Sequence, residues 1–297
     1  YKTFYLFILG SIMLGFSQAN QQFYRYAAAD NVSSNLKSKA ISLVLAGGLI
    51  AAVIGPEVSR YSFDIFPEYI YLATYLFAAL IQIFNFTILI FIKIKKPEKV
   101  IQKLRPLSEI LIQKTLIIAI SAAAVGYSLM SFIMTATPLQ IVNVCKLGDS
   151  ASATVIQWHV IAMFAPSFFT GSIISFLGNR KVMLIGVLLY ALSIFFSVIG
   201  QTVPHFWIAL FLCGLGWNFL YIGGSDIIAK CALPEERAKV QGVTDFIIFI
   251  FVATGSFLAG FLHSSLGWEI MMLYTLIPII LIFFSIIIIR PQEIKAI

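Results

Sequence analysis

Polar side chains follow one face of an otherwise apolar segment near the start of the chain. Gln18, Gln21, Gln22 and Arg25 are spaced by three, one and three residues, which in a helix places them on one side. The guanidinium of Arg25 keeps its charge and presents a fork of donors, so it could bind an anionic group or pair with a carboxylate. Alternatively, Arg25 lies one turn from Asp30 and extends to a polar surface.

Two acidic residues in apolar surroundings are candidates for proton coupling. Asp245 lies near the start of a predicted helix, and Glu57 follows Gly55 and a proline. A carboxylate in a medium of low dielectric favours its protonated form, which suits it to binding and releasing protons. The alternatives are that Asp245 is a helix N-terminal charge stabilised by the dipole, and that Glu57 is an exposed acid paired with Arg60.

Aromatic and amide side chains could bind a planar organic solute. Trp217, Asn218 and Tyr221 share one helical face, and Tyr127 lies on another predicted helix. Stacking and a few hydrogen bonds suit such a solute, although helix packing selects similar residues. His159 is an imidazole within an apolar segment, where it could carry a proton or bind a ligand, or serve only the packing of the helix.

The sequence lacks the motifs of the common hydrolases and of ATP-driven pumps. HExxH, GxSxG and GxxxxGK[ST] are all absent, so neither hydrolysis nor ATP cleavage has a recognisable site. Cys145, Cys213 and Cys231 have no spacing typical of a disulfide framework or a metal centre. We therefore expect a protein that is not an enzyme, with no cofactor and no metal.

The composition indicates the elements that position these residues. The 297 residues are 60% apolar and 11% charged, with a mean hydropathy of +0.96, whereas soluble domains are about 45–50% apolar and about 25% charged. Apolar runs of about 20 residues are typical of helices that cross a bilayer. The pattern predicts an all-α polytopic bundle of nine transmembrane helices, near 4–28, 41–59, 69–92, 115–137, 153–176, 182–200, 205–228, 243–262 and 270–289.

The positive charges predict the orientation of this bundle. The nine-helix count places most of the 20 lysines and arginines on the side of the long 93–114 loop, which is the cytoplasmic side by the positive-inside rule. The net charge of +7 is thereby explained without nucleic acid. We expect a multi-pass protein of a bacterial inner membrane with a cytoplasmic C-terminus.

Two stretches, 15–60 and 214–260, share a layout. Each has a helix with glycine and amide residues, an aspartate at the inner end (Asp30 and Asp226), a basic loop and a second helix with a glycine. Duplicated halves are typical of secondary transporters, whose substrate sites lie between the repeats, although chance resemblance is the alternative. Six predicted helices follow the 93–114 loop and three precede it, so we expect the first half to lack three helices.

Three motifs carry a family resemblance. Residues 171–181 read GSIISFLGNRK, residues 234–242 read PEERAKVQG, and residues 45–60 read LAGGLIAAVIGPEVSR. In their order along the chain these motifs resemble the major facilitator superfamily, with the chain corresponding to helices four to twelve of the usual twelve. The resemblance implies three helices of a first bundle in 1–92, a cytoplasmic linker in 93–114 and a second six-helix bundle in 115–297.

The resemblance and the charge pattern together imply a secondary active transporter. We expect a monomer in the lipid bilayer that moves a small organic solute, driven by protons, with export slightly favoured by the Gly55-Pro56 helix. The alternatives are an uptake permease for a vitamin-like or nucleoside-like solute, and a nonfunctional truncated remnant.

Overall fold

The computed structural model describes residues 3–92, 105–233 and 235–288, and the regular elements within them are helical. The α-helices are α1 (Phe4–Asp30), α2 (Lys37–Ala46), α3 (Gly48–Ser62), α4 (Leu72–Phe91), α5 (Leu107–Leu111), α6 (Lys114–Pro138), α7 (Asp149–Phe164), α8 (Ser167–Leu177), α9 (Asn179–Ile199), α10 (Val203–Cys231), α11 (Arg237–Leu266), α12 (Trp268–Tyr274) and α13 (Leu276–Ile288). A 3₁₀ turn (Ser34–Leu36) precedes α2, and a π-helix (Leu139–Val144) continues α6. The predicted all-helical architecture is confirmed.

Seven helices or helix pairs in the described residues are long and apolar enough to cross a membrane. The count reaches eight when α7 and α8, which meet at a bend of 42°, are taken as one span. Helix α1 has 27 residues but is not among these seven, because the glutamines and Arg25 of its second half lower its apolar character. The nine-helix count therefore stays a prediction.

The bend between α7 and α8 has a local cause in the sequence. Pro166 follows the last turn of α7 and lacks the N–H that would continue the helical hydrogen bonds. The side chain of Asn218 in α10 holds the bend, because its Nδ2 donates to the backbone oxygen of Met163 and to Ser167 Oγ, both at 2.6 Å. Thr170 Oγ1 donates to Asn218 Oδ1 at 2.6 Å. The broken span is thus fastened to α10.

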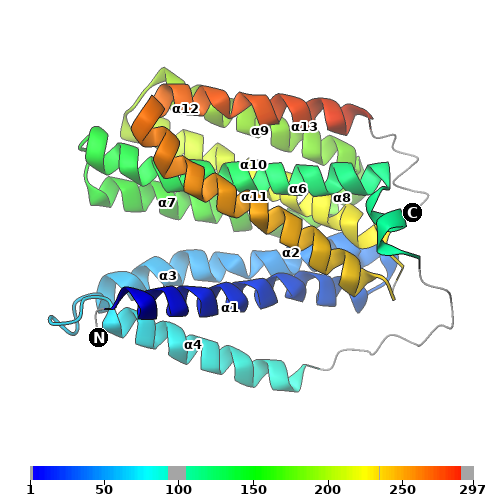
Figure 1. Ribbon diagram of the computed structural model, residues 1–297, viewed down its shortest axis with the longest axis horizontal. Helices are drawn as coiled ribbons and strands as arrows, with labels where there is room; N and C mark the ends of the chain where they lie inside the picture. Colours follow the sequence, from blue (N-terminus) through cyan, green and yellow to red (C-terminus); the bar gives the residue numbers. More distant parts are fainter. Residues whose placement is uncertain (1–2, 93–104, 234, 289–297) are drawn as a thin grey trace.

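The helices form two groups: in Figure 1, α1 to α4 lie below and α6 to α10, α12 and α13 above, and α11 runs from the upper group down to the level of α1. Helix α2 packs against α8 and α3 packs against α7, so the groups meet along these pairs. Residues 93–104 of the predicted linker, with their five lysines, lie outside the described residues. The predicted division into 1–92, 93–114 and 115–297 remains a proposal.

The contact between α2 and α8 depends on Gly171. A Cβ at this position would lie 2.7 Å from the backbone oxygen of Ser38 and 2.8 Å from the Cα of Lys39. Both atoms belong to the backbone of α2, so neither can move aside as a side-chain end would. The two helix groups approach each other here because Gly171 has no side chain.

We expect Gly171→Ala to destabilise the protein by about 1–3 kcal/mol, the usual cost of overpacking. Gly260→Ala is the matched control, because a Cβ at Gly260 in α11 has open space around it and alanine favours the helix. Thermal unfolding of the detergent-solubilised variants measures the difference. Equal stability of G171A and G260A would contradict the close approach of α2 and α8.

Candidate functional site

Five aromatic rings from four helices gather near the middle of the second helix group. They are Tyr127 of α6, Phe164 of α7, Trp217 and Tyr221 of α10, and Phe249 of α11, here called the aromatic cluster. The Trp217 and Tyr221 rings are stacked, with centroids 5.1 Å apart and planes inclined by 19°. Tyr127 stands edge-on to Trp217, Tyr221 and Phe249 at 5.4, 5.1 and 5.5 Å. In this structure the rings pack against one another, and aromatic rings of this kind also stack with planar solutes.

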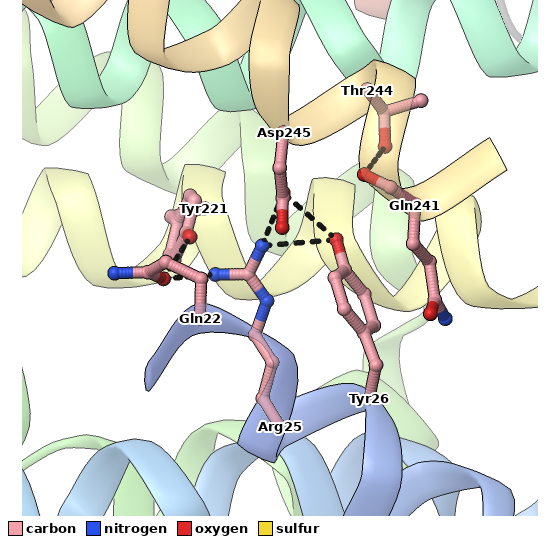
Figure 2. Close-up of polar contacts among 7 residues, drawn as sticks. All are labelled: Gln22, Arg25, Tyr26, Tyr221, Gln241, Thr244 and Asp245. Carbon is pink, nitrogen blue, oxygen red and sulfur yellow. Dashed lines mark hydrogen bonds and ion pairs between the residues drawn. The ribbon is translucent and has the colours of Figure 1, made fainter. Parts of the chain in front are cut away.

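A buried ion pair joins the two helix groups beside this cluster. Arg25 of α1 donates from Nη2 to Asp245 Oδ1 of α11 at 2.7 Å, and the two residues are 1% and 7% exposed. The hydroxyl of Tyr26 accepts from the same Nη2 at 2.9 Å and donates to Asp245 Oδ1 at 3.3 Å. Figure 2 shows Arg25 and Tyr26 reaching from α1 toward Asp245.

The guanidinium of Arg25 also contacts the aromatic cluster. Its central carbon lies 4.4 Å from the centre of the Tyr26 ring and 4.5 Å from that of Tyr221, a cation–π arrangement. Arg25 Nη1 donates to Gln22 Oε1 at 2.7 Å, and the Tyr221 hydroxyl donates to the same oxygen at 2.9 Å. Gln22 therefore ties α1 to α10 (Figure 2).

Three buried polar atoms in this region have no hydrogen-bond partner within the described residues: Arg25 Nε, Asp245 Oδ2 and Trp217 Nε1. A buried polar atom without a partner is costly, and such atoms usually await a ligand or water. Two of the three are donors and one is an acceptor. The site can therefore give hydrogen bonds to a solute and also accept one.

The structure decides between the alternatives for the two charged residues. Arg25 pairs with the carboxylate of Asp245 and does not extend toward Asp30. The carboxylate of Asp30 instead accepts a hydrogen bond from Arg237 Nη1 at 2.5 Å. Asp245 is not a helix N-terminal charge, because α11 begins at Arg237 and the dipole effect fades within the first turn. The sequence had suggested a later start because residues 237–242 are polar.

Other predicted site residues lie elsewhere. His159 is fully buried, with Nδ1 2.7 Å from the backbone oxygen of Leu210, and Asn218 is engaged at the α7–α8 bend. Gln18 is exposed and Gln21 is half-buried on α1. Glu57 lines a groove of about 390 Å³ between α3 and α4 with apolar side chains. The Arg60 side chain lies outside the described residues.

Sequence reasoning did not single out Tyr26, Phe249 or Phe164 for the site. Tyr26 bonds both members of the ion pair, and Phe249 lies one turn after Asp245 on α11, beside Tyr127. The i+4 spacing of Phe249 from Asp245 could have indicated it. Phe164 stands edge-on to Trp217 at 5.6 Å.

Polar contacts also join the groups at the predicted cytoplasmic end. Asp226 of α10 is fully buried and accepts from Ser38 Oγ of α2, Asn179 Nδ2 of α9 and Lys230 Nζ at 2.6, 2.8 and 2.6 Å. Asp30 and Asp226, which correspond in the proposed repeat, each contact a residue of the opposite group: Arg237 and Ser38. This end of the interface is closed.

A further ion pair, Arg105–Glu236, lies outside the spans and joins the segment before α5 to the residue before α11. Arg105 Nε and Nη2 donate to the two Glu236 oxygens at 3.0 and 2.6 Å, and the backbone N–H of Leu233 donates at 3.1 Å. The hydrogen bonds from Arg105 lower the pKa of Glu236 from 4.5 to about 2, although burial opposes this shift. The ionised carboxylate thus stabilises the folded state.

The lowered pKa of Glu236 gives a pH prediction. A carboxylate whose pKa is lower in the folded state contributes full stability above its unfolded value of 4.5, and loses it as the pH falls toward about 2. We expect Glu236→Gln to flatten the dependence of the unfolding free energy on pH between 4.5 and 2. Denaturant unfolding across this window measures it, with Glu235→Gln as the control. A wild-type slope in E236Q would contradict the assignment.

Comparisons with known proteins agree with this architecture. The family model described as Major Facilitator Superfamily matches residues 146–296. The riboflavin transporter RfnT of Brucella anthropi is 40% identical over 271 residues, covering 90% of this chain and 68% of the relative.

More distant relatives are named as an MFS-type transporter and as a multidrug resistance protein. The uncharacterized MFS-type transporter YdeG of Bacillus subtilis is 26% identical, over 87% of this chain and 64% of the relative. The multidrug resistance protein MdtL of Shewanella oneidensis is 23% identical, over 57% of this chain and 44% of its own length. The chain thus spans about two thirds of the length of RfnT and YdeG. The family match and the similarity to RfnT show that the chain belongs to the major facilitator superfamily of membrane transporters.

Proposed function

We propose that this protein is a secondary transporter of a planar, uncharged aromatic solute, bound between the two helix groups. The observation that carries the proposal is the aromatic cluster beside the Arg25–Asp245 pair, because it joins stacking surfaces to unpartnered donors and an acceptor. Polar groups inside a membrane bundle are typical of a transport pathway. The proposed site consists of Gln22, Arg25, Tyr26, Tyr127, Trp217, Tyr221, Phe249 and Asp245.

Riboflavin is the first candidate solute. RfnT is named as a riboflavin transporter, and the ring system of riboflavin is planar, aromatic and uncharged, with both hydrogen-bond donors and acceptors. The stacked Trp217 and Tyr221 and the edge of Tyr127 suit such a ring. Export of planar aromatic drugs is the second candidate, supported by the Gly55-Pro56 helix and the similarity to MdtL.

Alternating access supplies the mechanism of the proposal. When the two groups rock about the central site, the cytoplasmic contacts Asp30–Arg237 and Asp226–Ser38 must separate before that side opens. The same motion draws α1 from α11 and parts Arg25 from Asp245. An isolated carboxylate in a low-dielectric medium favours its protonated form, so Asp245 is the proposed proton-coupling residue. Glu57, which lines the α3–α4 groove, is the second candidate.

The proposal includes the topology of the protein in the membrane. The protein is a monomer that crosses a bacterial inner membrane nine times, with the C-terminus and the 93–114 linker in the cytoplasm. The gathering of lysines and arginines in the predicted inner loops supports this orientation. Cysteine labelling from outside the cell, at single cysteines placed in each predicted loop, tests it.

Binding in detergent tests the proposed site. We expect riboflavin to bind the purified protein saturably, with quenching of flavin fluorescence as the ring stacks on Trp217. Lumiflavin, which keeps the ring system and has a methyl group in place of the sugar-like chain, should compete, whereas ribitol, which keeps only that chain, should not. Competition by ribitol alone, or the absence of saturable quenching, would contradict a site built on aromatic stacking.

A further inference from the structure

The charges at the proposed site balance. Arg25 is buried, and the ionisable groups that act on it most strongly are Tyr26, Asp245 and Tyr127. Of these three, only Asp245 carries a charge near neutral pH. One cation and one anion at 2.7 Å therefore leave the site with no net charge.

The guanidinium offers no free fork to an anion. Nη1 donates to Gln22, Nη2 donates to Tyr26 and Asp245, and the central carbon lies 4.4 and 4.5 Å from the centres of the Tyr26 and Tyr221 rings. A phosphate or carboxylate group binds arginine best through two parallel hydrogen bonds. Only Nε is without a partner within the described residues, so an anionic solute that bonds two nitrogens must displace Gln22, Tyr26 or Asp245. The solute then lies beside the Asp245 carboxylate, with two negative charges close together in a buried site.

We infer that Asp245 determines the charge specificity of the transporter: by neutralising Arg25, it admits uncharged ring systems and excludes their phosphorylated or carboxylated analogues. This inference rests on the proposed function and adds the chemical class that the site rejects. The polar groups left over, Asp245 Oδ2 as acceptor and Arg25 Nε and Trp217 Nε1 as donors, suit a ring that carries both an N–H and a carbonyl group.

Replacing Asp245 with asparagine tests the inference, because the side chain keeps its shape and loses its charge. In D245N the Arg25 charge has no partner, and we expect riboflavin 5′-phosphate to bind about 10- to 100-fold more tightly than to the wild type, as expected for one unscreened charge. The double variant R25Q/D245N should lose this gain. Asp30→Asn is the matched control, because it removes a carboxylate from the other Asp–Arg pair between the helix groups.

Two readouts separate this inference from the proposed function. The first is competition of riboflavin 5′-phosphate against riboflavin. The second is the thermal stabilisation of each variant by riboflavin 5′-phosphate or inorganic phosphate, which needs no riboflavin binding. If the wild type does not bind riboflavin but phosphate stabilises D245N alone, the proposed solute is wrong and the charge selection stands. If riboflavin binds and D245N treats the phosphorylated form as the wild type does, the charge selection is wrong.

The opposite substitution covers the case in which D245N does not fold. Arg25→Gln leaves Asp245 without its cationic partner, so a planar cation that takes the place of the guanidinium would pair with the ionised carboxylate. We expect proflavine, a planar aromatic cation, to bind R25Q about 10-fold or more tightly than the wild type. Equal proflavine affinity in the two proteins would overturn the inference.

Discussion

Arg25→Ala is expected to abolish solute binding and to destabilise the protein by about 3–5 kcal/mol, the usual cost of leaving one member of a buried ion pair without its partner. Asp245 is 7% exposed and, among the described residues, would keep only the Tyr26 hydroxyl as a hydrogen-bond partner, 3.3 Å from Oδ1. The variant also removes the cation that lies within 4.5 Å of the centres of the Tyr26 and Tyr221 rings. Unfolding in detergent and riboflavin binding measure the two effects.

The double variant R25A/D245A separates charge from packing. Because it leaves no isolated charge in the interface, we expect it to be more stable than either R25A or D245A, while still failing to bind the solute. Stability losses that simply add in the double variant would show that the two side chains do not interact, contrary to their 2.7 Å contact.

Trp217→Ala is expected to have the second large effect. Trp217 is 2% exposed and contacts Tyr127, Phe164 and Tyr221, so its removal should cost about 3–5 kcal/mol of stability and eliminate the stacking surface for the solute. Loss of flavin quenching together with a lowered unfolding temperature is the expected result.

Trp217→Phe isolates the hydrogen bond proposed for Nε1. The phenylalanine keeps an aromatic ring but has no donor, and the wild-type Nε1 has no partner within the described residues. Removing a donor that bonds only the solute should weaken binding by about 0.5–1.5 kcal/mol, which is about 2- to 12-fold in Kd. Unchanged affinity in W217F would exclude Nε1 from solute recognition.

The helices were predictable because their signal is local. Each apolar run must satisfy its own backbone within a bilayer, so length and apolar character alone locate a span. The start of α11 was less predictable, since its first turns, from Arg237 to Gly242, are polar and lie outside the apolar run. Helix α1 shows the converse, because its polar face, with Gln18, Gln21, Gln22 and Arg25, lowers the apolar character by which a span is recognised.

The site was predictable only in its parts. The face that carries Gln22 and Arg25 was visible as a periodicity, and Asp245 as an acid in an apolar segment. Their pairing joins residues 220 positions apart, and no local pattern specifies which acid meets which base. Asn218 shows the limit most clearly, because its amide is used by a bend whose geometry depends on three other residues.

Flux through the reconstituted protein, expressed from its complete gene, tests the central claim most directly. Proteoliposomes loaded with riboflavin should take up labelled riboflavin by exchange, and an imposed proton gradient should drive its accumulation. The W217A variant should reduce the exchange to that of protein-free vesicles, whereas G260A should leave it unchanged. Riboflavin exchange that is no faster in vesicles with the wild-type protein than in protein-free vesicles would contradict transport of this solute through the aromatic cluster.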